Sequence, residues 1–304
     1  MNDKTLIVVV GPTAVGKTAA AIKLARYFKT SVISADSRQF YREMSIGTAK
    51  PNAEELAAAK HYFINSQSVT ESFNVGDFEI EGLKVIADIF KSNHYAIMAG
   101  GSGLFIKAIC EGFDDIPPAK PGIRERLNTE FSERGMEHIL QKLHLADPAY
   151  YNEVDTNNPQ RVIRALEVYE STGNPFSAYR SAQSRKRAFR IIKIGLNMPR
   201  EQLYAQINTR VDIMMEGGLI DEVKSLLPFR NFNALKTVGY SEIFEVIDGN
   251  TDLKTAVNLI KQHTRQFAKR QLTWFRKDAG INWINPLEDD IIAIATKLLN
   301  TQLF

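Results

Sequence analysis

Short apolar runs alternate with longer stretches of helical spacing over the first third of the 304-residue chain. Apolar runs of about five residues, joined by amphipathic helices, are typical of the buried strands of a parallel sheet. The pattern predicts strands at residues 6–10, 31–34 and 95–99, and helices at residues 17–28 and 75–92. We therefore expect an α/β fold built around a parallel sheet.

The pattern changes after Gly112, where prolines at positions 117, 118 and 121 interrupt it. The next sixty or so residues show helical spacing and no strand, which indicates an all-helical insertion. Helices are predicted there at residues 123–134, 136–143 and 159–172. A strand at residues 191–196 then returns to the sheet, and three long helical stretches follow it. We expect an α/β core with C-terminal helices, residues 1–112 and 190–304, and a helical insertion, residues 113–189.

A glycine-rich turn follows the first predicted strand and has the sequence Gly11-Pro12-Thr13-Ala14-Val15-Gly16-Lys17-Thr18. It fits the phosphate-binding P-loop pattern at every fixed position and stands between a strand and a helix. The glycines let successive backbone N–H groups face one anion, and the following helix adds its positive N-terminal end. Lys17 supplies a positive charge for the terminal phosphate, and the Thr18 hydroxyl is a candidate Mg²⁺ ligand. The motif predicts a polyphosphate ligand.

Two further polar motifs follow the next two strands: Asp36-Ser37-Arg38-Gln39 and Gly100-Gly101-Ser102-Gly103. Ligands of open α/β sheets bind where the strands end, so we expect both motifs to lie beside the P-loop. The Asp36 carboxylate is a candidate acceptor for a substrate proton, but an Asp here can also cap a turn or join a Mg²⁺ shell. The strand at 95–99 ends without the Asp with which many P-loop ATPases hold Mg²⁺. This argues against a motor ATPase or a switch GTPase.

Charge is unevenly distributed along a chain whose net charge is only +3. Residues 261–277 hold six Lys or Arg and no Asp or Glu, and Lys261, Arg265, Lys269 and Arg276 lie on one helical stripe. The missing acidic partners favour an anionic ligand such as a nucleic acid. Two other basic groups, Arg161 with Arg164 and Arg185-Lys186-Arg187 with Arg190, are equally consistent with a solvated surface.

The composition is that of a soluble globular protein. The first apolar run has only about six residues, far short of the ~20 that span a membrane, and no basic leader precedes it. We expect a cytoplasmic protein without a membrane segment. Cys110 is the only cysteine, which excludes an internal disulfide and predicts a small core residue. The five histidines lack metal-ligand spacing, so no zinc site is expected.

Taken together, a series of motifs resembles the bacterial tRNA dimethylallyltransferases, also called tRNA isopentenyltransferases. Besides the P-loop they are Asp36-Ser-Arg-Gln-Phe-Tyr41, Gly47-Thr-Ala-Lys-Pro51, Gly100-Gly-Ser-Gly-Leu-Phe105, Asn158-Pro-Gln-Arg-Val-Ile-Arg-Ala-Leu-Glu167, Arg210-Val-Asp212, Val238-Gly-Tyr240 and Ala268-Lys-Arg-Gln-Leu-Thr-Trp-Phe-Arg276. The match runs in order over nearly the whole chain. Two departures are mild: Val15 stands where the family commonly has Ser, and Ser102 and Phe105 replace a usual Thr and Tyr.

The resemblance implies a P-loop NTPase-like core with an inserted tRNA-binding domain. It implies transfer of a dimethylallyl group from dimethylallyl diphosphate to the exocyclic amine of the adenine 3′-adjacent to the anticodon, in tRNAs reading codons that begin with U. Mg²⁺ and the P-loop, with Lys17, Thr18 and Arg210 as catalytic residues, would stabilise the departing diphosphate. Asp36 would take the proton from the amine, which is a poor nucleophile because its lone pair is delocalised into the ring.

The resemblance also implies contacts with the tRNA anticodon stem-loop. They fall on Asp36, Ser37, Arg38, Gln39, Ser102, Arg124, Gln160, Arg161, Val162, Ile163 and Arg164. The acceptor adenine must leave its stack to reach the allylic carbon, at a cost of a few kcal/mol. We expect the protein to act as a monomer.

Three other functions share part of this pattern. A small-molecule P-loop kinase would consume ATP without RNA, but the basic stripe and the helical insertion argue against it. A regulatory RNA-binding module would use the P-loop only to sense nucleotide, and Asp36 beside the P-loop argues against that. A prenyltransferase acting on free adenine nucleotides is chemically nearer, and the full-length match with its insertion favours tRNA.

Overall fold

The computed structural model describes residues 4–114, 116–180 and 185–301. The chain divides into two compact units: a core unit, Met1–Glu111 with Lys186–Phe304, and an insertion unit, Gly112–Arg185. The core unit resumes slightly before the predicted position 190, because Arg187 is already anchored in it. The Arg187 guanidinium donates to the backbone oxygens of Ala108 and Ile109 and pairs with the Glu79 carboxylate at 2.6 Å.

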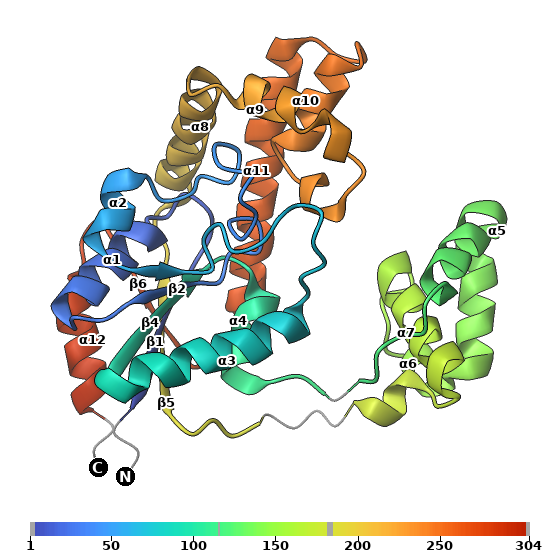
Figure 1. Ribbon diagram of the computed structural model, residues 1–304, viewed down its shortest axis with the longest axis horizontal. Coiled ribbons are helices and arrows are strands. Elements are labelled where there is room, and N and C mark those ends of the chain that lie inside the picture. Colours follow the sequence, from blue (N-terminus) through green and yellow to red (C-terminus); the bar gives the residue numbers. More distant parts are fainter. Residues whose placement is uncertain (1–3, 115, 181–184, 302–304) are drawn as a thin grey trace. The chain divides into compact units, whose positions relative to one another are not determined.

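Within the described residues, six parallel strands form one sheet in the order β3-β2-β4-β1-β5-β6 (Figure 1). They are β1 (Thr5–Val10), β2 (Val32–Ser34), β3 (His61–Tyr62), β4 (Tyr95–Gly100), β5 (Arg190–Leu196) and β6 (Ile281–Ile284). The four predicted strands are confirmed as β1, β2, β4 and β5. The sequence pattern does not predict β3 or β6, because β3 has only two residues and β6 carries Asn282 and Trp283 between its isoleucines.

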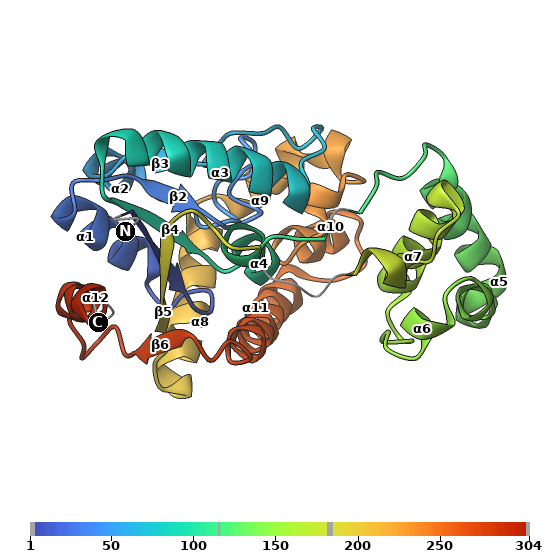
Figure 2. The same ribbon diagram turned by 90° about the horizontal axis from the view of Figure 1, so that it is seen from below.

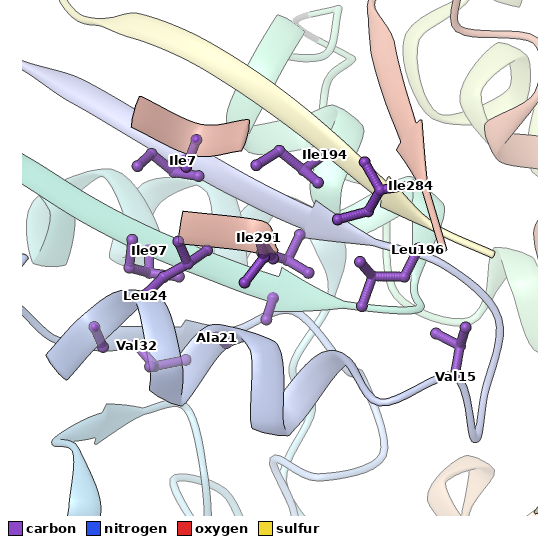
Figure 3. Packing of buried hydrophobic residues seen from close by; sticks show 14 of the residues in the cluster. Ile7, Val15, Ala21, Leu24, Val32, Ile97, Ile194, Leu196, Ile284 and Ile291 are labelled. Atoms are coloured by element: carbon purple, nitrogen blue, oxygen red, sulfur yellow. The ribbon is translucent and has the colours of Figure 1, made fainter. Parts of the chain in front are cut away.

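Helices cover both faces of the sheet (Figures 1 and 2). α1 (Lys17–Tyr27) and α12 (Ile291–Asn300) pack on one face, and α3 (Val75–Ser92) and α4 (Gly103–Glu111) pack on the other. Alternate β1 residues enter the two layers, with Ile7 facing the first and Val8 the second. Figure 3 shows Ile7 with Leu24 of α1 and Ile291 of α12. A strand buried on both faces needs apolar residues throughout, which explains why residues 6–10 form an uninterrupted apolar run.

The remaining helices of the core unit are α2 (Ala53–Ala58), α8 (Arg200–Glu216), α9 (Leu219–Ser225), α10 (Tyr240–Ile247) and α11 (Leu253–Phe275). Of the three long helical stretches expected after β5, only α8 and α11 are long. Residues between them form the short α9 and α10 and two 3₁₀ turns, Leu227–Phe229 and Asn233–Leu235. Their apolar side chains pack with Met44 from the loop after β2 in a separate cluster. The C-terminal helices are thereby tied to the loops where the strands end.

The described part of the insertion unit consists of helices and turns. It contains α5 (Ile123–Ala146), α6 (Pro148–Tyr151), α7 (Pro159–Thr172) and a 3₁₀ turn, Phe176–Tyr179. Gly135, with φ 78° and ψ −175°, breaks α5 into the two predicted helices. α7 matches its predicted range, because the Asn158 side chain caps its first turn and Gly173 adopts a left-handed conformation after its end. Among the described residues, we find no helix that combines the length and the apolar character needed to cross a membrane.

Candidate active site

The P-loop connects the end of β1 to the start of α1, as the sequence predicts. Gly11, with φ 149°, has no room for a side chain, because an added Cβ would lie 2.6 Å from the backbone oxygen of Leu196 in β5. Ala14 (φ 67°) and Gly16 (φ 96°) turn the backbone sharply before the helix begins. The N–H groups of this turn and of the first turn of α1 therefore have the arrangement that suits an anion, and phosphate binding here stays a prediction.

Lys17 closes over this turn, and its ammonium group donates to the backbone oxygen of Pro12 at 2.7 Å. Removal of the ammonium group from water lowers the pKa of Lys17 to about 8, while the Asp36 carboxylate raises it and Arg210 lowers it further. Because burial disfavours the charged form of Lys17, an anionic ligand nearby would favour that form and raise the pKa again.

α8 brings Arg210 to the P-loop, where its guanidinium donates to the Thr13 hydroxyl at 3.4 Å. Burial lowers the pKa of Arg210, and the Asp36 carboxylate opposes this. Thr13, Asp36 and Arg210 line one cavity of about 450 Å³, which we call the main cavity. The family resemblance predicts Arg210 as a site residue, and the fold brings it to the P-loop from a helix that is distant in sequence.

The segment after β2 lies beside the P-loop, and β4 fixes its backbone. The Ala35 N–H donates to the Ala99 oxygen at 2.8 Å, and the Ser102 N–H donates to the Ala35 oxygen at 3.2 Å. The Ser102 hydroxyl accepts from the Ser37 N–H at 3.0 Å, which joins the two polar motifs. Gly100 allows this approach, because an added Cβ would lie 2.2 Å from the Ala35 oxygen.

Asp36 both lines the main cavity and stabilises its own turn, since its Oδ1 atom accepts from the Arg38 N–H at 3.1 Å. Of the alternatives left by the sequence, the turn cap is confirmed, and the position of the carboxylate at the cavity is compatible with proton acceptance, which stays a prediction. The Gln39 amide donates to the backbone oxygens of Thr48 and Ala49 at 3.3 and 3.2 Å. Gln39 thus holds a loop that forms part of the cavity wall.

Gln271 of α11 is a site residue that the sequence analysis missed. Its Oε1 atom accepts from the Thr13 N–H at 2.7 Å, and its amide donates to the Gly101 oxygen at 2.9 Å. The side chain is buried, at 6% exposure. One signal was available, because Gln271 is a polar residue at helical spacing from the apolar positions Ala268 and Phe275, which are both buried.

Glu222 of α9 was also missed, although it fixes another wall of the main cavity. Its carboxylate accepts from the backbone N–H groups of Ser45, Ile46 and Gly47 at 2.9, 2.8 and 3.0 Å, and from the Tyr240 hydroxyl at 2.6 Å. No local pattern distinguishes Glu222 from a surface carboxylate, because all four donors are distant in sequence.

The main cavity has both polar and apolar walls. The apolar part of its lining consists of Leu104, Phe105, Val211, Met214, Val238, Ile260, Phe267 and Trp274. Phe267 and Trp274 remain 40% exposed, which is high for aromatic side chains of this size. A small apolar group and a planar ring would both fit against this wall, next to the P-loop.

The basic stripe of α11 has partners that its own sequence does not reveal. Lys261 pairs with Asp212 of α8 at 2.6 Å, and Arg265 donates to the Asn208 side chain at 2.7 Å. The expectation that this stretch lacks acidic partners is therefore wrong for Lys261, because a helix distant in sequence supplies one. Lys269 lines a second surface cavity, of about 680 Å³, away from the P-loop residues.

The predicted tRNA-contacting residues of the insertion unit have three kinds of surroundings. Val162 and Ile163 are fully buried in its core, so their side chains support α7 and offer no surface to a partner. Arg124 and Arg164 both contact Glu167, a buried residue in a small ionic network that also includes Gln160. Arg164 contacts Glu167 at 2.9 Å and Arg124 contacts it at 3.6 Å, while Arg124 also donates to Gln160 at 3.2 Å. Arg161 is exposed.

Thr18 is placed to act as a metal ligand, since it lies at the first turn of α1 beside Lys17. Within the described residues, no three His, Cys, Asp or Glu side chains converge on one point. A P-loop metal ion fits these residues without such a cluster, because phosphate oxygens, one hydroxyl and water supply its ligands. Cys110 is buried, as expected for a core residue.

Comparisons with known proteins show the family of the chain. Residues 39–278 match the protein family described as IPP transferase. A tRNA dimethylallyltransferase of Cytophaga hutchinsonii is 51% identical over 286 residues, which is 94% of each chain. A solved tRNA isopentenylpyrophosphate transferase of Bacillus halodurans is 37% identical, with a TM-score of 0.70 over 98% of this chain and 95% of the other. A solved eukaryotic dimethylallyltransferase has a TM-score of 0.81, with 97% of this chain and 78% of the eukaryotic chain covered. Because the two sequences are only 24% identical, this similarity shows the fold alone.

The P-loop is built between β1 and α1, and Arg210 and Gln271 are brought to it from helices near the other end of the chain. The family match, residues 39–278, includes Arg210 and Gln271, and the identity to the Cytophaga hutchinsonii protein extends over 94% of the chain. Together these findings establish that the chain belongs to the IPP transferase family, the family of the tRNA dimethylallyltransferases.

Proposed function

We propose that this protein transfers a dimethylallyl group from dimethylallyl diphosphate to the exocyclic amine of the adenine 3′-adjacent to the anticodon, in tRNAs reading codons that begin with U. The products are isopentenyladenosine in tRNA and free diphosphate. One observation carries the proposal: a single cavity combines Thr13 of the P-loop with Arg210, the Asp36 carboxylate and an apolar wall. These are the groups needed to bind diphosphate, remove a proton and hold a prenyl group.

The diphosphate would bind at the P-loop, with its charge balanced by Lys17 and Arg210. Burial lowers the pKa of both cations, because it removes the water that stabilises their charge. A bound diphosphate would stabilise the two positive charges instead. Donors already placed around the leaving group need no reorganisation as its negative charge develops. Mg²⁺ at the Thr18 hydroxyl would neutralise part of that developing charge.

Asp36 would accept the proton of the adenine amine as the carbon–nitrogen bond forms and the carbon–oxygen bond breaks. Its carboxylate lines the main cavity, while the hydrogen bond from the Arg38 N–H holds it in place. Because that bond uses Oδ1, the other oxygen is available to a substrate. Positioned carboxylates typically contribute ~10²–10⁴-fold to such proton transfers.

The apolar wall of the main cavity would hold the dimethylallyl group and exclude water, which would otherwise capture an allylic cation. The half-exposed rings of Phe267 and Trp274 suit stacking of a splayed base, the usual mode of single-stranded RNA recognition. In the insertion unit, Arg124, Gln160, Arg161 and Arg164 would contact the anticodon stem-loop. We also propose that the protein acts in the cytoplasm, where tRNA is found, and that it acts as a monomer.

The test is direct. The protein is incubated with Mg²⁺, labelled dimethylallyl diphosphate and either tRNA or AMP. We expect label in tRNA, at the adenine beside the anticodon, and none in AMP. Label in AMP would indicate the nucleotide prenyltransferase, and phosphoryl transfer from ATP with no labelled product would indicate the kinase.

A further inference from the structure

A second cavity beside the P-loop joins the proposed diphosphate site to β3. This small cavity has a volume of about 40 Å³ and is lined by Lys17, Thr18, Asp36, Gln39 and His61, together with mainly apolar residues. One water molecule needs roughly 10–15 Å³ of such volume. The small cavity is therefore of a size for water molecules and too small for a substrate.

The two ring nitrogens of His61, at the start of β3, have different surroundings. The Nδ1 atom lies 2.7 Å from the backbone oxygen of Ala59, and a carbonyl can only accept, so Nδ1 carries the proton. Burial lowers the pKa of His61, so the ring is neutral near pH 7 and Nε2 holds a lone pair. That Nε2 atom is buried, and none of the described residues hydrogen-bonds to it.

None of the side chains that line the small cavity donates a hydrogen bond to Nε2 in the structure. The Lys17 ammonium group donates to Pro12, and the Ser34 hydroxyl donates to Gln39 at 3.3 Å. Both N–H directions of the Gln39 amide are used by backbone oxygens. A buried acceptor without a partner costs roughly 1–3 kcal/mol, so a donor from outside the chain would relieve this cost.

We propose that His61 is a positioning residue of the diphosphate site: its Nε2 accepts a hydrogen bond from a water molecule in the small cavity that belongs to the hydration shell of Mg²⁺ at Thr18. Mg²⁺ dehydrates reluctantly and keeps several waters when it binds to phosphates. Groups that hold such outer ligands orient them and typically change metal affinity by ~10–100-fold when removed. This inference rests on the proposed diphosphate site and adds a specific role for β3.

Two substitutions of His61 distinguish the contribution of Nδ1 from that of Nε2. His61→Asn keeps an N–H near the position of Nδ1 for the Ala59 oxygen but removes the acceptor at Nε2. His61→Gln places an amide oxygen near the position of Nε2 and so retains an acceptor there. Calorimetry would measure the affinity of each protein for inorganic pyrophosphate, first in EDTA and then with Mg²⁺.

For the wild type we expect Mg²⁺ to increase pyrophosphate affinity. His61→Asn should lose roughly ten-fold or more of that increase and bind as the wild type does in EDTA, whereas His61→Gln should keep most of it. The proposal is overturned if Mg²⁺ gives the wild type no increase, if His61→Asn keeps the full increase, or if both variants weaken binding equally in EDTA.

A measurement on the wild type covers the case in which His61→Asn does not fold. The ¹⁵N resonances of the His61 ring should show a proton on Nδ1, and Mg²⁺ with pyrophosphate should shift Nε2 and leave Nδ1 nearly unchanged. A proton on Nε2, or an Nε2 resonance that does not respond, contradicts the proposal. Because neither experiment involves prenyl transfer, failure of the tRNA labelling assay would leave the results interpretable.

Discussion

Gln271 in α11 accepts a hydrogen bond of 2.7 Å from the backbone N–H of Thr13 in the P-loop. The same buried amide donates to the Gly101 oxygen at 2.9 Å. An amide both donates and accepts, so Gln271 satisfies two backbone groups that an apolar side chain would leave unpaired. A helix near the C-terminal end thus fixes the phosphate-binding turn relative to the loop that follows β4.

We expect Gln271→Leu to lower the free energy of unfolding by about 1–3 kcal/mol, the usual cost of leaving buried polar groups without partners. It should also raise the KM for dimethylallyl diphosphate, because the Thr13 backbone is no longer held. Urea unfolding and steady-state kinetics measure the two effects. Thr273→Ala, at an exposed position on the same helix, is the control. Wild-type stability in Gln271→Leu would show that the two hydrogen bonds contribute little.

Asp36→Asn should slow the chemical step by about 10²–10⁴-fold and leave tRNA affinity largely intact. An amide oxygen can still accept from the Arg38 N–H, so the turn is preserved while the proton acceptor is removed. Single-turnover transfer with saturating substrates measures the step directly, and filter binding measures tRNA affinity. A single-turnover rate near that of the wild type would exclude Asp36 as the general base.

The lowered pKa of Lys17 predicts how diphosphate binding depends on pH. In the free protein this pKa is about 8, and a bound anion stabilises the protonated form and raises the pKa. Binding above pH 8 therefore takes up a proton, so affinity should be constant below about pH 7 and fall by up to about tenfold per pH unit above 8. Lys17→Met should bind weakly at every pH.

Calorimetry with dimethylallyl diphosphate between about pH 6.5 and 9.5 tests this, and Lys17→Met reports the contribution of the ligand's own ionisation. If the wild type and Lys17→Met show the same pH dependence, Lys17 is not the titrating group. ATP should compete only weakly in the same titration and should not be hydrolysed.

The sequence predicts features that depend on neighbouring residues. β1 and α1 were predicted because a strand buried on both faces is apolar throughout and because the P-loop needs glycine at fixed positions. α7 was placed correctly, since its Asn158 cap and its terminal Gly173 are local signals. The parallel sheet and the helical character of the insertion unit follow from the same kind of pattern.

The missed features depend on interactions between segments far apart in the chain. Gln271 acts on Thr13, and Glu222 binds N–H groups that precede it by more than one hundred and seventy residues. Asp212 pairs with Lys261 only because α8 and α11 pack together. Hydrophobic periodicity shows which face of a helix or strand is buried, but it does not show which other segment of the chain packs against that face.

The arginines of the insertion unit give the last prediction. Arg161 is exposed, and Arg164 shares Glu167 with Arg124, so the carboxylate orders two guanidinium groups on one surface. Replacing Arg161 and Arg164 by Ala should raise the Kd for tRNA and flatten its salt dependence. The slope of log K against log salt should change by roughly one unit or somewhat less for each tRNA phosphate that an arginine no longer neutralises.

Arg126→Ala is the matched control, because Arg126 is a solvent-exposed arginine of the same unit that already pairs with Glu130 and Glu170. It should change tRNA affinity and the salt slope much less than the double substitution. The KM for dimethylallyl diphosphate should remain that of the wild type in both proteins, since the P-loop belongs to the core unit. If the double variant binds tRNA normally at several salt concentrations but binds the diphosphate more weakly, α7 acts on the donor site, and its assignment to tRNA is wrong.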